Sequence, residues 1–213
     1  AAALDEQGDL FFTGGYAPDL GTISPLLYMY QPANKSLHAF YAPPQQPLGF
    51  GNSMLYDGAG HLYLSEGFLS PGYTSALAGI GWYRYDIASG EWHNLASLPL
   101  GLGYVQLVQK SDGNILLLGG SLDAGQHHPG LQIYLYNVQQ NTWSQETGTL
   151  PTALSGSESC ADGQGHLVIV GGYDAVHSQS LNATWLLDLQ TLQWHALASL
   201  PGGGSVLGSA VCD

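Results

Sequence analysis

Residues 112–120 read Asp-Gly-Asn-Ile-Leu-Leu-Leu-Gly-Gly, which is a polar turn, a short apolar strand and a glycine pair in direct succession. The same order recurs at Gly14-Gly15, at Glu66-Gly67 and at Gly171-Gly172. The pairs therefore return at an almost constant interval, and self-similarity at a fixed period of this kind is the mark of a repeat architecture. This periodicity decides the fold more than any single residue does.

Other features keep the same phase. Each repeat has a polar turn before the apolar strand, an aromatic third strand, a fourth strand and a closing proline. The turn residues are Asp5, Asp57, Asp112 and Asp162; the third strands carry Tyr28, Tyr83, Tyr134 and Trp185; the fourth carry Leu37, Trp92, Trp143 and Trp194; the prolines are Pro44, Pro99, Pro151 and Pro201. One repeat is thus expected to hold four short strands.

This pattern resembles the kelch repeat of β-propellers, whose period of about 50 residues it matches. The resemblance implies an all-β, kelch-like β-propeller, with residues 1–213 as a single domain of four four-stranded blades. It does not imply one activity, because kelch propellers include interaction modules, oxidases and sugar-processing enzymes. Two departures are visible: Glu66 replaces a glycine of the second pair, and the basic residue common in the family's first strand is absent. The chemistry of basic-rimmed kelch pockets is therefore not transferred to this chain.

The ends of the chain are expected to complete one blade together. Residues 205–212 read as a first strand, and the chain opens at the turn before a second strand, so we predict terminal-strand closure in the blade that contains Gly14-Gly15. The expected blades are residues 205–213 with 1–43, then 44–98, 99–150 and 151–204. A closed four-bladed ring, part of a longer ring, and two chains that form an eight-bladed ring by strand exchange all remain open.

Composition excludes some classes of function. Three Lys and Arg residues against sixteen Asp and Glu residues give a formal net charge of −13, so a polyanionic nucleic acid would be repelled. Charged residues make up 9% and hydrophobic residues 45% of the chain, with 30 glycines, which indicates a well-buried, turn-rich β protein. No apolar run is long enough to cross a bilayer. The acidic, lysine-poor composition favours an extracellular or secreted protein.

Two cysteines and two glycosylation sequons bear on that location. Cys160 and Cys212 fall on first strands of consecutive repeats, and they are either small buried residues or a disulfide, which requires Cα atoms within about 7 Å. Asn34 and Asn182 begin N-x-S/T tripeptides, of which Asn34 lies in an expected turn where a glycan could be carried.

Binding residues are expected on the loops between second and third strands, which share one propeller face with the connections between blades. These loops are residues 16–25, 68–80, 121–131 and 173–183, and they mix Tyr, His, Pro, Ser and Asp, a composition that suits adaptable recognition. The predicted binding residues are Tyr16, Asp19, Tyr73, Asp123, His127, His128, Tyr173, Asp174 and His177.

No catalytic residue, metal site or cofactor is predicted. His61 and His166 share one repeat position, as do His38, His93 and His195, so these histidines have structural roles, and the Asp-Gly pairs are turns. Glu66 and Glu158 stand out because one replaces a structural glycine and the other lies on an inner strand. No ligand spacing of a zinc motif, nucleophile elbow, phosphate loop or dinucleotide fingerprint is present.

These observations favour a non-enzymatic binding or assembly module that recognises protein or glycan through its propeller-face loops, with self-association as a further option. The alternative is a carbohydrate-active or oxidising enzyme of the kelch type. An enzyme should gather titratable groups in one place, whereas a binding module should spread its contacts over loops and blade edges.

Overall fold

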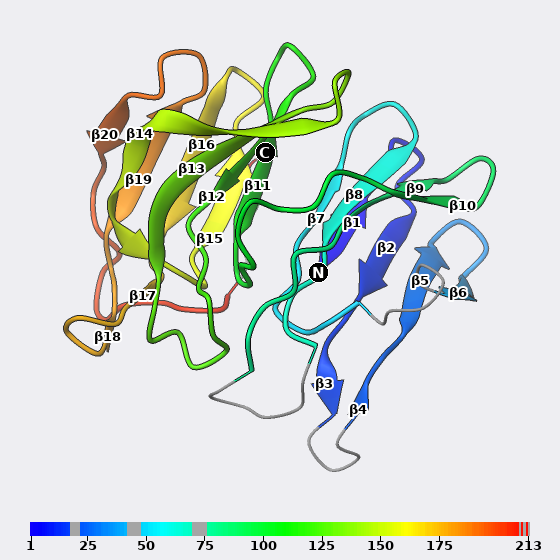
Figure 1. Ribbon diagram of the computed structural model, residues 1–213, viewed down its shortest axis with the longest axis horizontal. Helices are drawn as coiled ribbons and strands as arrows, with labels where there is room; N and C mark the ends of the chain where they lie inside the picture. Colours follow the sequence, from blue (N-terminus) through cyan, green and yellow to red (C-terminus); the bar gives the residue numbers. More distant parts are fainter. Residues whose placement is uncertain (18–21, 42–47, 70–75, 209, 211, 213) are drawn as a thin grey trace. The chain divides into compact units, whose positions relative to one another are not determined.

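The computed structural model consists of β-strands joined by turns and loops, and no helix occurs in the part of the chain that it describes (Figure 1). It describes residues 1–17, 22–41, 48–69, 76–208, 210 and 212. The chain gathers into two compact units: residues 1–103 with 123–125 form the first unit, and residues 104–122 with 126–213 form the second. A helix able to span a membrane is not found among the described residues.

The first unit contains two four-stranded antiparallel sheets and one short hairpin. The first sheet has β1 (Ala2–Leu4), β2 (Leu10–Thr13), β5 (Leu26–Gln31) and β6 (Ser36–Tyr41), in that order. The second sheet has β7 (Met54–Tyr56), β8 (His61–Ser65), β9 (Trp82–Asp86) and β10 (Glu91–Asn94), also in chain order. The hairpin of β3 (Tyr16–Ala17) and β4 (Thr22–Ile23) separates β2 from β5.

The second unit repeats this plan. The third sheet has β11 (Gln106–Gln109), β12 (Ile115–Leu118), β13 (Gly130–Asn137) and β14 (Thr142–Leu154). The fourth has β15 (Glu158–Ala161), β16 (His166–Val170), β19 (Thr184–Asp188) and β20 (Trp194–Ala196), with the hairpin of β17 (Tyr173–Asp174) and β18 (Gln179–Ser180) between β16 and β19. The expectation of four strands per repeat is confirmed. The boundary expected at residue 150 is not, because β14 continues through Pro151 to Leu154.

The prediction of terminal-strand closure is also wrong. The edge position beside β2 is occupied by β1, whose residues Ala2 and Leu4 pair with Phe12 and Leu10. The described residues after 204 therefore supply no strand of that sheet. Within the second unit the backbone of Ser205 instead exchanges hydrogen bonds with Gly172 and Leu181, each of them 2.8 or 2.9 Å long. All four strands of the first sheet come from the N-terminal part of the chain, between Ala2 and Tyr41.

The Asp-Gly turns have the geometry that the repeat predicts. Oδ1 of Asp57 accepts hydrogen bonds from the backbone N–H groups of Ala59 and His61, at 2.8 and 3.0 Å. Oδ1 of Asp162 accepts equivalent bonds from Gln164 and His166. Each carboxylate thus closes the turn between a first and a second strand, and the following glycine takes a positive φ.

The first glycine of each pair is required for a second reason. Gly14, Gly119 and Gly171 have positive φ, and a Cβ on any of them would collide with the carbonyl oxygen of the segment that leads out of the sheet, at Gly49, Leu154 and Ser205 respectively. For Gly119 the built Cβ would lie 2.6 Å from the oxygen of Leu154. The glycine pair thus permits a backbone-to-backbone approach that any side chain would prevent.

Each unit has its core between its two sheets. In the first unit one face of the first sheet, with Phe11 and Leu27 fully buried, packs on a face of the second sheet; the second-sheet members are Leu62, Leu64, Tyr83, Tyr85, Met54, Tyr56 and Trp92. In the second unit the third sheet contributes Val108, Leu116, Leu118, Ile133 and Leu135, and the fourth contributes Leu167, Ile169, Leu187 and Trp194. Both cores therefore use corresponding positions of the repeat.

Candidate functional site: the loops of the second unit and the polar network of the second sheet

Two loops of the second unit are anchored on the same residue, Ser155. Its carbonyl oxygen accepts a hydrogen bond of 2.9 Å from the backbone N–H of Tyr173, at the base of the β17–β18 hairpin. Its hydroxyl donates a bond of 2.7 Å to Oε1 of Gln126, in the loop between β12 and β13. Ser155 itself is buried. We name residues 126–130, 154–157 and 173–180 the loop face.

The loop face carries most of the predicted binding residues of the second unit. In the hairpin, Oδ1 of Asp174 accepts hydrogen bonds from the backbone N–H groups of Val176 and His177, and Oδ2 lies 2.6 Å from Nδ1 of His177. In the neighbouring loop His127 and His128 are exposed, with their ring centroids 6.5 Å apart and edge to face. Tyr173 is half-buried. Exposed imidazoles thus stand on loops whose bases are fixed.

The other predicted binding residues are placed differently. Asp123 belongs to the first unit, where it bridges to Leu77, and its side chain is buried rather than presented on a surface. Tyr16 begins β3 and pairs through its backbone with Ile23, the same position that Tyr173 has in the β17–β18 hairpin. Asp19 and Tyr73 lie outside the described residues.

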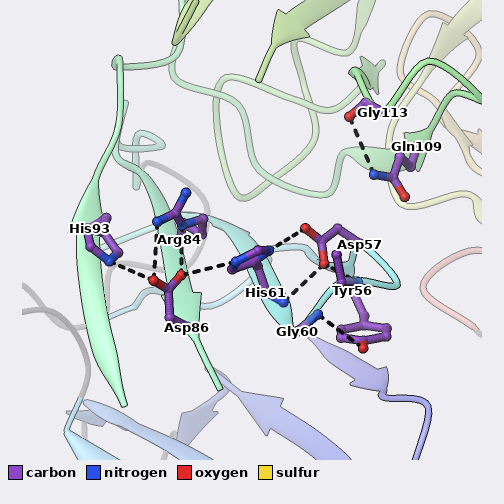
Figure 2. Close-up of polar contacts among 10 residues, drawn as sticks. Tyr56, Asp57, Gly60, His61, Arg84, Asp86, His93, Gln109 and Gly113 are labelled. Carbon is purple, nitrogen blue, oxygen red and sulfur yellow. Dashed lines mark hydrogen bonds and ion pairs between the residues drawn. The ribbon is translucent and has the colours of Figure 1, made fainter. Parts of the chain in front are cut away.

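A second group of polar side chains lies on one face of the second sheet (Figure 2). Asp86 on β9 is at its centre: Arg84 donates from Nε to Oδ1 at 2.8 Å and from Nη2 to Oδ2 at 3.2 Å. Nε2 of His93 on β10 lies 2.9 Å from Oδ2, and Nε2 of His61 on β8 lies 3.8 Å from Oδ1. His61 also contacts Asp57 through Nδ1 at 2.7 Å.

These contacts shift the acidity of the groups. Burial alone would raise the pKa of Asp86, but hydrogen bonds and charge from Arg84, followed by those from His93, outweigh it and lower that pKa. Burial would lower the pKa of Arg84, yet Asp86 and Tyr63 raise it. The pKa of Tyr63 is raised, chiefly by burial and then by the charge of Asp57. Asp86 and Arg84 thus hold each other in their charged forms, whereas the phenol of Tyr63 is held in its neutral form.

This network joins neighbouring strands of the second sheet. His61 on β8 and His93 on β10 each contact Asp86 on the intervening strand β9, while the Arg84–Asp86 pair lies within β9. The sequence analysis placed the two histidines in structural positions but missed Arg84 and Asp86. A signal was present, because Arg84 is the sole arginine of the sequence and an acid two positions along a strand shares its face.

The two glutamates singled out in the sequence have structural partners. Glu66 is buried, and its carboxylate accepts hydrogen bonds from the backbone N–H of Gly81 at 2.7 Å and from the hydroxyl of Tyr83 at 3.2 Å. Burial, then the charge of Glu66, raise the pKa of Tyr83 to about 12. Glu158 is buried too, and its Oε1 accepts bonds from Oγ of Ser205 and the backbone N–H of Gly208.

The structure also bears on metal binding and on whether the two cysteines are bonded. Within the described residues, no three His, Cys, Asp or Glu side chains are arranged to hold a metal ion. Of the two readings for the cysteines, the structure shows the disulfide: Cys160 and Cys212 are bonded, with Cα atoms 5.6 Å apart. The sequon residues Asn34 and Asn182 are both exposed.

Comparisons with known proteins find similarity to kelch-repeat proteins. A family model of the kelch motif matches residues 160–201. A RING finger domain and kelch repeat-containing protein of Dictyostelium discoideum is 26% identical over 57% of this chain, and Kelch domain-containing protein 10 of Xenopus tropicalis is 28% identical over 66% of it. The chain spans 11% and 35% of the lengths of these relatives, respectively.

A solved structure has the same fold. The structure of YjhT aligns with 96% of this chain at a TM-score of 0.74 and 17% identity, and this chain covers 66% of its length. At this identity the likeness concerns the fold alone. The expected all-β fold, with its four four-stranded blades, is confirmed by the sheets of this chain and by that likeness.

Proposed function

Because this chain belongs to the kelch-repeat β-propeller family, we propose that it is a non-enzymatic protein-binding module that contacts its partner through the loop face. The observation that carries this proposal is the shared anchor at Ser155. One buried residue holds both loops, one through its hydroxyl and the other through its carbonyl oxygen, so that the exposed groups of both can meet the same partner. Recognition residues are commonly found on loops that a rigid scaffold holds in place.

The chemistry of the loop face supports a protein partner. His127, His128 and His177 each combine an apolar ring with a hydrogen-bonding nitrogen, while Val176 is 82% exposed at the tip of the hairpin. Such a mixture of apolar contact and a few hydrogen bonds is usual in protein–protein interfaces. The carboxylate of Asp174 is engaged by its own hairpin, so it shapes the loop and orients the ring of His177.

We further propose an extracellular or secreted location. The Cys160–Cys212 disulfide supports it, since structural disulfides persist mainly in oxidising compartments. The exposed sequons at Asn34 and Asn182 are compatible with the same location. Mass spectrometry of the protein from its native source, with and without a reducing step, tests this directly: free thiols at both positions would contradict it.

The experiment that tests the binding function compares variants rather than relying on capture alone. Affinity capture from the native source is carried out with the wild type, with a His127→Ala/His128→Ala variant and with His177→Ala. His38→Ala is the matched control, because His38 is an exposed histidine on β6 of the first unit and does not belong to the loop face. We expect a protein that is recovered with the wild type and the control but is depleted with both loop variants.

The candidate partner is then purified and titrated by calorimetry against the same variants. A loss of about tenfold or more in affinity for the loop variants alone would support the proposal, since a few anchors dominate most interfaces. Partners that bind all four proteins equally would contradict it. Binding of a purified glycan that depends on the same histidines, or turnover of a sugar, would replace the protein partner with a glycan or with the enzymatic alternative.

A further inference from the structure

Asn34 lies in the turn between β5 and β6, within the tripeptide Asn34-Lys35-Ser36. The pairing of the two strands ends at Gln31 and Ser36, so residues 32–35 form the turn, and all four of them are exposed. An Asn-x-Ser tripeptide with an accessible Asn side chain is an acceptor for N-linked glycans. The turn therefore presents such an acceptor on the surface of the first unit.

The same turn recurs between the third and fourth strands of each sheet. Its last residue has a positive φ in every case, at Lys35, Gly90, Asn141 and Leu192. The residue before it can close the turn with a side-chain oxygen: Oδ1 of Asn34 accepts a hydrogen bond of 3.0 Å from the backbone N–H of Ser36, and Oγ of Ser89 accepts one of 3.3 Å from Glu91. The structural role of Asn34 therefore needs only its oxygen, because a serine fills the same role in the second sheet.

The side-chain nitrogen of Asn34 has no structural role in this turn. Nδ2 donates no hydrogen bond to any residue that the structure describes. Transfer of a glycan replaces one hydrogen atom on Nδ2 and leaves Oδ1 as a carbonyl oxygen, so the bond from Ser36 is kept. A glycan on Asn34 would thus cost the turn none of its hydrogen bonds.

The second tripeptide, Asn182-Ala183-Thr184, has an exposed Asn but a backbone that other segments hold. The carbonyl oxygens of its three residues accept hydrogen bonds of 2.8 or 2.9 Å from the backbone N–H groups of Leu200, Gly171 and Leu197, respectively. A transferase must break these bonds to draw the tripeptide into its active site. Residues 32–35 make no such backbone bond to another described segment, so the turn of Asn34 can open at a much smaller cost.

We propose that Asn34 carries an N-linked glycan and is occupied in more of the molecules than Asn182. Nδ2 attacks C1 of an oligosaccharide that is attached to a lipid pyrophosphate. The bond between Nδ2 and C1 forms, the bond between C1 and the pyrophosphate oxygen breaks, Nδ2 gives up one proton, and the lipid pyrophosphate leaves. The sugar donor and the transferase belong to the secretory route, so this inference rests on the proposed extracellular or secreted location. It uses no residue of the loop face.

A reaction with purified components tests the difference between the two sites. The folded, unglycosylated protein, with its disulfide formed, is incubated with an oligosaccharyltransferase and a lipid-linked oligosaccharide. Peptides of residues 28–41 and 176–190 are the matched controls, because they contain the two tripeptides without the folded backbone. We expect both peptides and Asn34 of the folded protein to be modified, and Asn182 of the folded protein to remain unmodified. A folded protein that accepts no glycan at Asn34, or that accepts one equally at Asn182, would contradict the proposal.

Secretion from cultured eukaryotic cells, behind an added leader peptide, tests the same site with variants. Asn34→Asp keeps the oxygen that closes the turn and removes Nδ2, while Ser36→Ala removes the hydroxyl of the tripeptide and keeps the backbone N–H. Both should lose the mobility shift that a glycanase reverses in the wild type. Ser36→Thr is the matched control and should keep it, because Asn-x-Thr is also an acceptor. Circular dichroism checks that each variant folds, and a shift that persists in Ser36→Ala at Asn34 would contradict the proposal.

The protein from its native source separates this inference from the proposals on which it builds. Mass spectrometry that finds a glycan on Asn34 together with the disulfide would support both the glycan and the location. The disulfide without a glycan on Asn34 would overturn the glycan and leave the location standing, whereas free thiols without a glycan would contradict both. Asn34→Asp should bind the loop-face partner as tightly as the wild type does, so the binding proposal is tested independently.

Discussion

Cys160 and Cys212 are joined by a disulfide that fastens the segment after residue 204 to the first strand of the fourth sheet. Glu158, two residues before Cys160, holds the same segment by accepting hydrogen bonds from Ser205 and Gly208. In the third sheet, Gln106 has the corresponding position: its Nε2 donates to the carbonyl oxygen of Ser157, and its Oε1 accepts from the hydroxyl of Ser159. The segment after residue 204 thus contacts the fourth sheet in the way that the start of the fourth sheet contacts the third.

Removal of this disulfide should lower the stability of the second unit. The bond closes a loop with a sequence separation of 52 residues, for which the chain-entropy model gives an upper value of about 4 kcal/mol. Urea unfolding of the wild type and of Cys160→Ser/Cys212→Ser, each with and without reductant, checks this. The double variant should be insensitive to reductant and should match the reduced wild type. A wild type whose midpoint does not move on reduction would contradict the prediction.

Glycine substitutions should separate backbone strain from steric collision. Gly113 and Gly119 both have positive φ, but a Cβ at Gly113 meets nothing within 4 Å, whereas one at Gly119 meets the oxygen of Leu154 at 2.6 Å. Gly113→Ala should therefore cost about 1 kcal/mol, and Gly119→Ala about 3 kcal/mol or more. Thermal or denaturant unfolding of both variants measures the difference. Equal losses would mean that strain alone explains the conserved phase of the glycine pairs within this chain.

The hydroxyl of Tyr83 should stay protonated far into the alkaline range. Its pKa of about 12 follows from burial and from the adjacent Glu66, so the stability that this group contributes is complete below the ordinary tyrosine pKa of about 10 and is lost as the pH rises towards 12. The ultraviolet difference between wild type and Tyr83→Phe should show no phenolate below about pH 11. Ionisation of Tyr83 near pH 10 in the folded protein would contradict this.

The same variant should also be less stable at neutral pH. Tyr83→Phe removes one donor from the buried carboxylate of Glu66, which keeps its bond from Gly81, and the expected loss is about 1–2 kcal/mol. Denaturant unfolding at pH 7 gives the value.

Asp86 should contribute to stability in a pH-dependent manner. Its pKa is lowered in the folded state, so its contribution is present above the unfolded carboxyl value of about 4 and is lost as the pH falls through the folded value. Asp86→Asn should therefore cost about 1 kcal/mol at pH 7 and almost nothing near pH 2. Urea unfolding at both pH values measures this. Asp112→Asn is the control, because its side-chain oxygen still accepts the bond from Asn114. A cost for Asp86→Asn that does not change with pH would contradict the prediction.

Much of the fold follows from the sequence because its determinants are local. The Asp-Gly turns, the alternation of side chains on each strand and the glycine pairs are each specified by a few neighbouring residues, and most of the repeats contain them. The origin of the first strand was missed because Ala2–Leu4 is short and carries no turn signal before it, while residues 205–212 match the repeat pattern better. The observed pairing of β1 with β2 shows which of these two segments forms the first strand.

The candidate site was only partly predictable. Asp174 and His177 are close in sequence and meet in one hairpin, so composition was enough to select them. Asp123 was selected by the same reasoning and is buried, because loop composition does not specify which side chains turn inward. The anchor at Ser155 joins segments 29 residues apart on one side, and no local pattern reports such a contact.

The engagement of Arg84 by Asp86 has a practical consequence for detecting this protein. Trypsin cleaves after lysine or arginine, and apart from Arg84 the chain offers only Lys35 and Lys110. Lys35 and Lys110 lie at the turns after β5 and β11, whereas Arg84 lies inside β9 with its guanidinium held by Asp86. The folded protein should resist digestion at β9, and even full digestion leaves residues 111–213, with their disulfide, uncut. Tryptic proteomics will therefore under-report this chain, and a protease that cuts at acidic residues is the better reagent for finding it.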